Sequence, residues 1–217
     1  MAVPLIFDLD GTLVDSSSGI LTSLSWAFTR LNLTPALELT PSIIGPPLYE
    51  TLKILSPHSD AKVLDDLAVV FKQHYDDVGF KETHAFSGVQ EMLKVLSLCE
   101  GIELHIATNK RKKPTSRIIS RLDWSHYFCS ILSPDSLSPT LPDKASMLTE
   151  IMLRSNCNGG NSLYVGDRID DYKAALASNM SFVFAAWGFE DNAANLNHDV
   201  VKADTPNATL LLDCLNY

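Results

Sequence analysis

Two aspartates, Asp8 and Asp10, directly follow a short apolar run and are the first residues whose spacing indicates chemistry. Residues 3–9 predict a buried strand, which Gly11 ends. Side chains two positions apart on a strand point to the same side, so both carboxylates can reach one site. Two negative charges this close need a cation or a shared proton, which indicates a magnesium site or a nucleophile with an acid/base partner. Two acidic turn residues that cap the next helix would give the same sequence.

Thr108 and Lys144 are polar residues at the ends of further predicted elements. Thr108 follows the predicted strand 102–107, and its hydroxyl, with the N–H of Asn109, suits a phosphoryl oxygen. A helix N-cap is an equally good interpretation of Thr108 taken alone. Lys144 begins a predicted helix, where the helix dipole disfavours a positive charge, so an electrostatic role elsewhere would explain it.

A second acidic cluster follows the predicted strand 162–165. Gly166 lets the backbone approach a ligand closely, and Asp167 can reach a metal ion shared with the first pair of aspartates. Asp170 and Asp171 begin the next helix, where the helix dipole favours negative charge. That simpler explanation fits Asp170 better than Asp167, and either Asp170 or Asp171 can turn inward.

Strands and helices alternate from residue 86 onward. The expected strands are 102–107, 128–132, 162–165, 181–185 and 200–203, and the expected helices are 88–98, 115–122, 144–154, 170–177 and 207–215. Parallel neighbours need crossover connections, so this alternation predicts an α/β fold, a three-layer Rossmann-like parallel sheet with helices on both faces.

The segment between the first strand and residue 85 predicts helices and no strand. The expected helices are 20–31, 48–55 and 60–78, and Gly45-Pro46-Pro47 separates the first two. We therefore expect an all-helical domain over residues 15–85, inserted into a core domain formed by residues 1–14 and 86–217.

The charge and cysteine content of the chain limit the kinds of partner and compartment that we expect. The 217 residues have a net charge of -9, which disfavours nucleic acid or an anionic membrane as the main partner. Four widely spaced cysteines without a Cys-x-x-Cys pair indicate neither a zinc knuckle nor a disulfide framework, as in a reducing compartment. No signal-peptide pattern or membrane-spanning apolar run is present, so we expect a soluble, unprocessed cytoplasmic protein.

The polar groups occur in the order of the four motifs of the haloacid dehalogenase superfamily of phosphohydrolases, which the chain resembles over essentially its whole length. The matching motifs are Asp8-x-Asp10-Gly11-Thr12, Thr108, Lys144 and Gly166-Asp167-x-x-x-Asp171. The helical insert resembles the small cap domain of that family. Within it, Ile44-Gly45-Pro46-Pro47-Leu48 looks like the phosphoglycolate phosphatase and 5′-nucleotidase branch.

The resemblance implies a Mg²⁺-dependent phosphatase in which Asp8 attacks phosphorus to form an aspartyl-phosphate. Asp10 would protonate the leaving oxygen and then activate water. The implied metal ligands are the Asp8 carboxylate, the Asp10 backbone carbonyl and Asp167, with Asp171 as support. Phosphoryl oxygens would be held by Thr108, Asn109 and Lys144.

The substrate that the resemblance implies is a small phosphorylated metabolite, such as phosphoglycolate or a nucleoside monophosphate, bound by a monomer or a homodimer. The substrate-binding residues would be Gly11, Thr12, Asn109, Gly45, Pro47 and Leu48. The cap would exclude water and select the leaving alcohol.

Other functions fit the same residues. A phosphomutase of the β-phosphoglucomutase type would use the same aspartates, whereas a dehalogenase would not need Asp10 as an acid/base. A phospho-accepting signalling receiver also combines aspartates with a Thr and a Lys, but it lacks the helical insert. A non-catalytic protein that binds a phosphorylated ligand would keep the fold alone. The basic run 110–113 fits a solvated loop best, although a localisation patch or a positive rim would look the same.

Overall fold

A six-stranded parallel sheet forms the centre of the computed structural model, which describes residues 2–157, 159–189 and 196–216. In spatial order its strands are β5 (Phe128–Leu132), β4 (Ile102–Ala107), β1 (Val3–Phe7), β6 (Leu163–Gly166), β7 (Ser181–Ala185) and β8 (Val201–Ala203). All neighbouring pairs are parallel. The chain adds strands on one side of β1 and then on the other, so β1 lies at the switch point where such sheets bind ligands.

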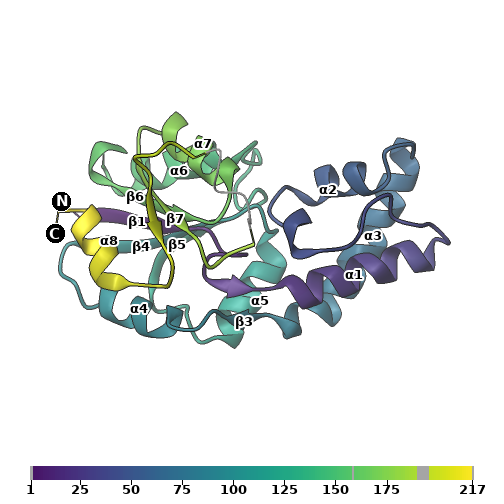
Figure 1. Cartoon of the computed structure of the whole chain (residues 1–217), viewed down its shortest axis with the longest axis horizontal. Coiled ribbons are helices and arrows are strands. Elements are labelled where there is room, and N and C mark those ends of the chain that lie inside the picture. Colours follow the sequence, from purple (N-terminus) through teal and green to yellow (C-terminus); the bar gives the residue numbers. More distant parts are fainter. Residues whose placement is uncertain (1, 158, 190–195, 217) are drawn as a thin grey trace.

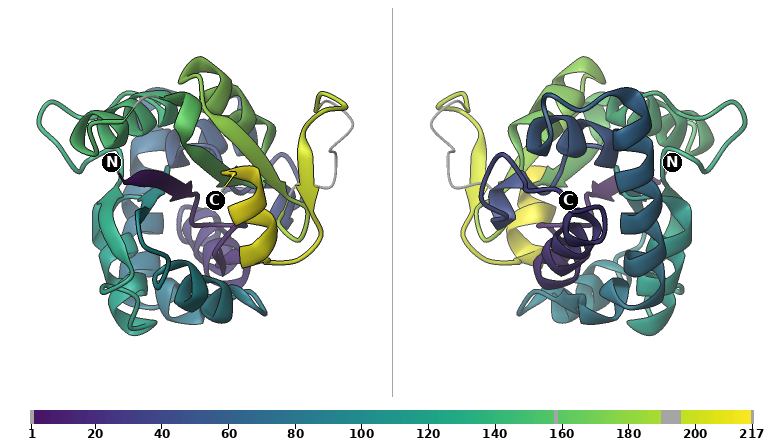
Figure 2. Two further views of the ribbon diagram at one scale, coloured as in Figure 1. Left: turned by 90° about the vertical axis from the view of Figure 1, so that its left-hand side faces the viewer. Right: turned by 90° about the vertical axis from the view of Figure 1, so that its right-hand side faces the viewer.

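Helices cover both faces of this sheet (Figures 1 and 2). One face carries α4 (Val89–Leu96), α5 (Lys112–Arg121) and α8 (Ala208–Cys214), and the other carries α6 (Lys144–Arg154) and α7 (Ile169–Ala177). Strand β1 supplies both layers, because Leu5 and Phe7 pack into the first cluster and Ile6 into the second. The predicted three-layer Rossmann-like core is confirmed.

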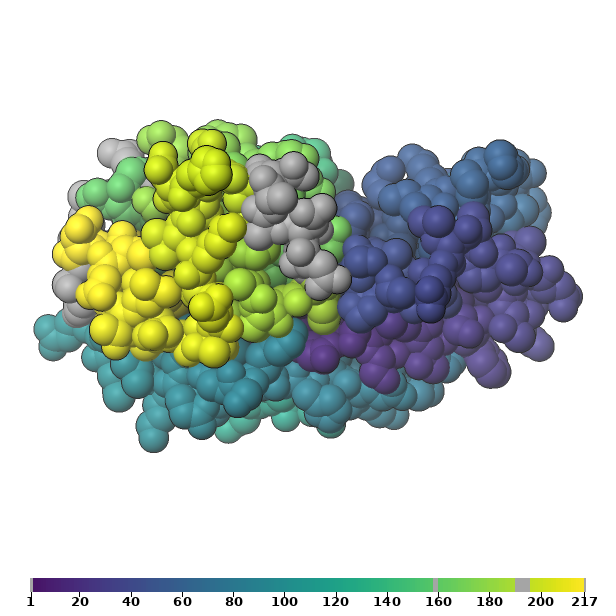
Figure 3. Space-filling view, viewed as in Figure 1, coloured from purple at the N-terminus to yellow at the C-terminus, as the bar shows by residue number. Residues whose placement is uncertain are grey.

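Three helices form a separate bundle at the end of the molecule opposite the chain termini (Figure 1). They are α1 (Ser17–Arg30), α2 (Leu48–Leu55) and α3 (Ala61–Asp77), with short 3₁₀ turns at Pro41–Ile43 and Gly79–Glu82. The side chain of Asp60 caps α3, whose buried stripe includes Leu67 and Phe71. These residues pack against α1 and α2 in a hydrophobic cluster of their own. We call residues 17–82 the cap, and Figure 3 shows it as a lobe beside the sheet domain.

The expectation that the segment between the first strand and residue 85 contains no strand was wrong. Residues Val14–Asp15 (β2) and His84–Ala85 (β3) pair in an antiparallel ladder where the chain enters and leaves the cap. Two-residue strands carry no hydrophobic period, and their partners are about 70 residues apart in sequence, so no local signal indicates the pairing. The division of the chain at residues 14/15 and 85/86 stays a prediction.

The other predicted elements differ from the structure mainly at their ends. Helix α5 begins at Lys112, three residues before its expected start, because Pro114 is tolerated in the first turn of a helix. Among the described residues, no helix is both long and apolar enough to cross a membrane.

Candidate active site

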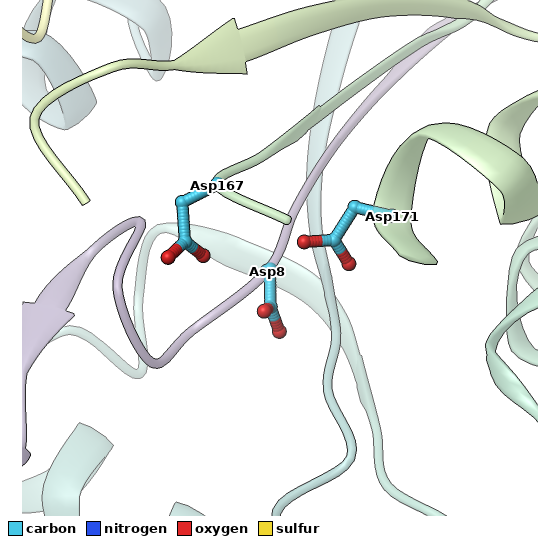
Figure 4. A group of neighbouring side chains, drawn as sticks. All are labelled: Asp8, Asp167 and Asp171. Atoms are coloured by element: carbon cyan, nitrogen blue, oxygen red, sulfur yellow. The ribbon is translucent and has the colours of Figure 1, made fainter. Parts of the chain in front are cut away.

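Three buried carboxylates, those of Asp8, Asp167 and Asp171, meet at the carboxyl ends of the central strands (Figure 4). Asp8 follows β1, Asp167 follows β6, and Asp171 lies in the first turn of α7. One oxygen of each lies within 4.8 Å of the others. Because β1 and β6 are parallel neighbours, their ends reach the same edge of the sheet, and the backbone N–H of Asp8 donates to Val165 at 2.9 Å.

This cluster accumulates negative charge that water does not screen. Burial raises the pKa of Asp8 to about 7, and the nearby charges of Asp171 and Asp10 add to the shift. Burial, together with Asp171 and Asp8, also raises the pKa of Asp167 well above its ordinary value. Oxygen Oδ1 of Asp8 is buried and has no hydrogen-bond partner in the described part of the chain. A set of hard oxygen ligands with one buried, unpaired oxygen fits a divalent cation such as Mg²⁺.

Lys144 provides the positive charge in the described part of this cluster. Its ammonium lies 3.0 Å from Oδ2 of Asp8 and contacts Oδ1 of Asp171. Burial lowers the pKa of Lys144, but the carboxylates of Asp171 and Asp8 outweigh this effect and raise it. Asp143 caps α6 by accepting a hydrogen bond from the N–H of Ser146 at 2.8 Å. The contacts of the Lys144 ammonium with Asp8 and Asp171 explain why a lysine is tolerated at the start of α6, where the helix dipole disfavours positive charge.

Asp171, and not Asp170, turns toward the cluster. The side chain of Asp170 is 69% exposed and pairs with Lys173 at the surface. Asp171 accepts hydrogen bonds from the backbone N–H of Arg168 and from the hydroxyl of Tyr164, both at 3.0 Å. These partners fix the Asp171 carboxylate, which suits the supporting position predicted for it.

Asp10 stands apart from the three carboxylates, although it borders the same cavity as Asp8. Its Oδ1 atom accepts a hydrogen bond from the Ser16 hydroxyl at 2.5 Å and lies 2.8 Å from the ammonium of Lys110. The carboxylate is therefore held on the cavity side and not in the carboxylate cluster. The contact of the Asp10 backbone carbonyl with a metal ion stays a prediction.

Two other predicted groups face the cavity as well. Thr108 and Asn109, which follow β4, both line it. The Thr108 hydroxyl accepts a hydrogen bond from the Lys110 N–H at 3.2 Å. The side-chain amide of Asn109 donates to the Gly45 carbonyl at 3.0 Å and so contacts the cap.

Gly11 and Thr12 are not among the described residues that line the cavity. The Thr12 hydroxyl donates to Asp167 at 3.3 Å. Gly11 has a φ of +85°, and a Cβ placed on it would lie 2.1 Å from an Asp167 oxygen. Both residues therefore shape the surroundings of Asp167, and the direct substrate contact expected of them stays a prediction.

A cavity of about 280 Å³ lies between the sheet domain and the cap. Gly45, Pro47 and Leu48 line it, so the cap loop singled out from the sequence does face the predicted nucleophile. The other cap residues that line the cavity are mostly apolar or aromatic. The apolar and aromatic ones are Ile20, Leu24, Ile43, Ile44, Pro46, Tyr49, Ala68, Phe71 and Tyr75.

The interpretation of the basic run 110–113 as a solvated loop was wrong for Lys110 and Arg111, whereas Lys112 and Lys113, at the start of α5, are exposed. The side chain of Lys110 is only 6% exposed and donates a hydrogen bond to the Tyr75 hydroxyl at 2.7 Å. Arg111 binds both oxygens of Asp76, at 2.6 and 3.3 Å, and Lys113 lies 3.2 Å from the same carboxylate. Lys110, Arg111 and Lys113 thus join the sheet domain to α3 of the cap. Periodicity within the run does not reveal this role.

Arg168 is another residue at this junction whose role sequence reasoning missed. Its guanidinium donates to the Ser42 carbonyl at 3.1 Å, and its side chain packs where a Cβ on Gly45 would lie. Its place inside the fourth motif was the signal available, because a residue beside Asp167 must lie near the site. Ser42, which accepts its hydrogen bond, had no such signal.

Known proteins are similar to this chain over most of its length. The chain is 28% identical to tyrosine-protein kinase PtkA of Mycobacterium tuberculosis over 186 residues, which are 85% of this chain and 62% of PtkA. It thus spans less than two thirds of that relative. It is also 28% identical to phosphoglycolate phosphatase of Xylella fastidiosa over 193 residues, 88% of this chain and 83% of that protein.

Solved structures show the same fold. The haloacid dehalogenase-like family protein SP0104 from Streptococcus pneumoniae matches with a TM-score of 0.85 and 24% identity, covering 98% of each chain. The family model of haloacid dehalogenase-like hydrolases matches residues 5–185, which include all four motifs. The chain therefore belongs to the haloacid dehalogenase-like hydrolase family.

Proposed function

We propose that this protein is a Mg²⁺-dependent phosphatase that hydrolyses a small phosphomonoester through an aspartyl-phosphate on Asp8. One observation supports this most strongly: Asp8 borders the cavity under the cap and lies beside both Lys144 and two further carboxylates. One of its buried oxygens also has no hydrogen-bond partner among the described residues. A relative named phosphoglycolate phosphatase, which aligns with 88% of the chain, supports the same reaction class.

In the proposed reaction the Asp8 carboxylate attacks phosphorus, and the bond from phosphorus to the leaving alcohol breaks. Asp10 donates a proton to the leaving oxygen. The same carboxylate then takes a proton from the water that attacks the phosphoryl group, and this step releases phosphate and restores Asp8. The position of Asp10 on the cavity side of Asp8 suits both transfers.

Asp8, Asp167 and Asp171, with the backbone carbonyl of Asp10, would hold the Mg²⁺ ion. When bound, the ion supplies positive charge that offsets repulsion between the carboxylate nucleophile and the phosphate. Lys144 contributes charge of the same sign from α6. Without added cations, the raised pKa of Asp8 would leave part of the nucleophile protonated near neutral pH.

Thr108, the backbone N–H of Asn109 and the ammonium of Lys144 would hold the phosphoryl oxygens as charge shifts in the transition state. The side chain of Asn109 is engaged with the Gly45 carbonyl, so its backbone is the part assigned to the phosphate. Gly45, Pro47 and Leu48 would then contact the leaving alcohol, because they line the cavity from the cap side.

The test is phosphate release from a panel of phosphomonoesters, with and without Mg²⁺. The panel contains phosphoglycolate, nucleoside monophosphates, sugar phosphates and phosphotyrosine. We expect Mg²⁺-dependent release that Asp8→Asn abolishes. The matched control is Asp170→Asn, because the side chain of Asp170 is exposed and pairs only with Lys173 in the described structure.

Three results would contradict or change the proposal. Release that Asp8→Asn leaves intact would exclude the proposed nucleophile. An isomerised sugar phosphate in place of free phosphate would indicate a phosphomutase. No turnover of any compound by the folded protein would favour a protein that only binds a phosphorylated ligand. We also propose a cytoplasmic location and a monomeric or homodimeric state. The four free thiols are compatible with a reducing compartment.

A further inference from the structure

Lys72 is a charged residue of the cap that the proposed reaction does not use. It lies on α3 and, although half-buried, lines the cavity together with Ala68, Phe71 and Tyr75. These positions recur every three or four residues, so they form one face of the helix, and that face is turned toward Asp8. A lysine on this otherwise apolar and aromatic face is not expected from packing alone.

The contacts of the other cavity cations set Lys72 apart. Lys110 lies against Asp10 and Tyr75, and Arg111 binds Asp76. Within the described ranges, Lys72 is the one cationic residue of the cavity wall without a carboxylate within 4 Å.

The other two lysines in α2 and α3 show the usual arrangement. Lys53 pairs with Glu50 and Lys62 pairs with Asp66, one turn away on the outer surface of the cap. Lys72 has no such neighbour, because position 68 is alanine and the carboxylate of Asp76 is bound by Arg111 and Lys113.

The cavity geometry indicates which part of a substrate Lys72 would meet. The phosphoryl group must lie at the sheet edge, against Asp8 and Thr108, so the leaving alcohol extends toward the cap wall. A positive charge in a partly apolar cavity is stabilised by an anion that enters with the ligand. The modest volume of about 280 Å³ favours a small leaving group.

We propose that Lys72 binds a carboxylate on the leaving group, so that the preferred substrates are small phosphorylated hydroxy acids. This inference rests on the phosphatase function proposed above. It narrows that function, because nucleoside monophosphates and neutral sugar phosphates carry no carboxylate for Lys72.

The test uses substrate pairs that differ only in this group. Phosphoglycolate is compared with 2-hydroxyethyl phosphate, and 3-phosphoglycerate with glycerol 3-phosphate. For at least one pair, we expect the carboxylate to raise kcat/KM about tenfold or more, the usual effect of one hydrogen bond to a charged group. Lys72→Met should reduce this ratio to about one, mainly through KM. Lys62→Met, a surface lysine of the same helix, should leave the ratio unchanged.

A charge reversal gives an independent readout. Lys72→Glu should increase kcat/KM for O-phosphoethanolamine relative to phosphoglycolate, because the new carboxylate pairs with the ammonium of that substrate. Binding is measured separately, by calorimetric titration of phosphoglycolate into Asp8→Asn with and without Lys72→Met. We expect the Kd to rise about tenfold when Lys72 is also replaced.

The outcomes separate the two proposals. If neither these pairs nor any compound of the wider panel is hydrolysed but the Kd still depends on Lys72, the phosphatase function fails and the carboxylate site stands. If both pairs are hydrolysed with equal kcat/KM, or if Lys72→Met leaves the ratio and the Kd unchanged, the role of Lys72 is overturned and the phosphatase function stands.

Discussion

The ammonium of Lys110 lies 2.8 Å from the carboxylate of Asp10. The same ammonium donates a hydrogen bond to the Tyr75 hydroxyl of α3 at 2.7 Å and lies 4.6 Å from the centre of that ring. Asp10 belongs to the sheet domain and Tyr75 to the cap. Lys110 therefore bridges the proposed acid/base residue and the lid over the cavity, so the position of the cap and that of Asp10 depend on each other.

Lys110→Met should reduce kcat/KM by about tenfold or more and lower the free energy of unfolding by about 1–3 kcal/mol, because Asp10 loses a charged partner. Tyr75→Phe keeps the ion pair and should have a smaller effect on both quantities. Lys112→Met serves as the control, since Lys112 is exposed. Steady-state kinetics and urea unfolding measure the two effects. Equal behaviour of the Lys110 and Lys112 variants would contradict the bridging role.

Asp76→Asn should weaken the attachment of the cap, because Asp76 holds Arg111 and Lys113. Burial raises the pKa of Asp76, but the hydrogen bonds and charges of Arg111 and Lys113 outweigh burial and lower it. This stabilisation is present above the ordinary pKa of an aspartate and is lost as the pH falls through the lowered value.

For Asp76→Asn we expect a loss of about 2 kcal/mol in the free energy of unfolding at pH 7 and a larger radius of gyration by small-angle X-ray scattering. The matched control is the exposed neighbour Asp77→Asn. An unfolding free energy and a radius of gyration that match those of the control would show that these ion pairs do not hold the cap.

His105 should make the fold sensitive to mild acid. It is buried in β4 with Nδ1 2.8 Å from the Ser130 hydroxyl, and burial lowers its pKa to about 4 although Glu103 opposes the shift. The unfolded chain binds a proton near the ordinary pKa of histidine, about 6.5. Stability is therefore complete above that pH and falls by up to about 3 kcal/mol between pH 6.5 and 4.

Urea unfolding across this pH range measures the effect. His105→Gln should flatten the decline, whereas the exposed His58→Gln should retain it. A decline of the same slope in His105→Gln would mean that other groups account for the acid sensitivity.

Gly45→Ala should disturb the cap loop over the cavity. Gly45 has a φ of +125°, and an added Cβ would lie 2.1 Å from Cδ of Arg168. The side chain of Arg168 must shift, which disturbs its hydrogen bond to the Ser42 carbonyl, and the positive φ strains the loop itself. We expect this strain to weaken the hydrogen bond from Asn109 to the Gly45 carbonyl and KM to rise severalfold. Gly101→Ala is the matched control, because Gly101 also has a positive φ but no atom within 4 Å of the added Cβ.

Both glycine variants should lose about 1–3 kcal/mol in the free energy of unfolding from backbone strain. Only Gly45→Ala should also change KM. An unchanged KM in that variant would exclude a contribution of this loop to substrate binding.

Local patterns and chain order predicted the parallel core and the meeting of Asp8 with Asp167, because strand periodicity and parallel topology together place both at one sheet edge. Residue types alone left Asp170 and Asp171 open, because adjacent helix positions differ by about 100° in direction. The spacing of the fourth motif pointed to Asp171. The pairing of Lys110 with Tyr75 joins two segments 35 residues apart and depends on how the cap sits on the sheet domain. Such contacts follow from tertiary packing and leave no periodic signal.

In the proposed reaction Asp8 becomes phosphorylated during each turnover. The direct test is acid quenching of the protein within milliseconds of mixing with the best ³²P-labelled substrate and Mg²⁺, followed by peptide mapping. We expect label in the peptide that contains Asp8 in the unsubstituted protein, and no labelled peptide in Asp8→Asn. Label on another residue, or phosphate release by Asp8→Asn at the rate of the unsubstituted protein, would contradict the proposed reaction.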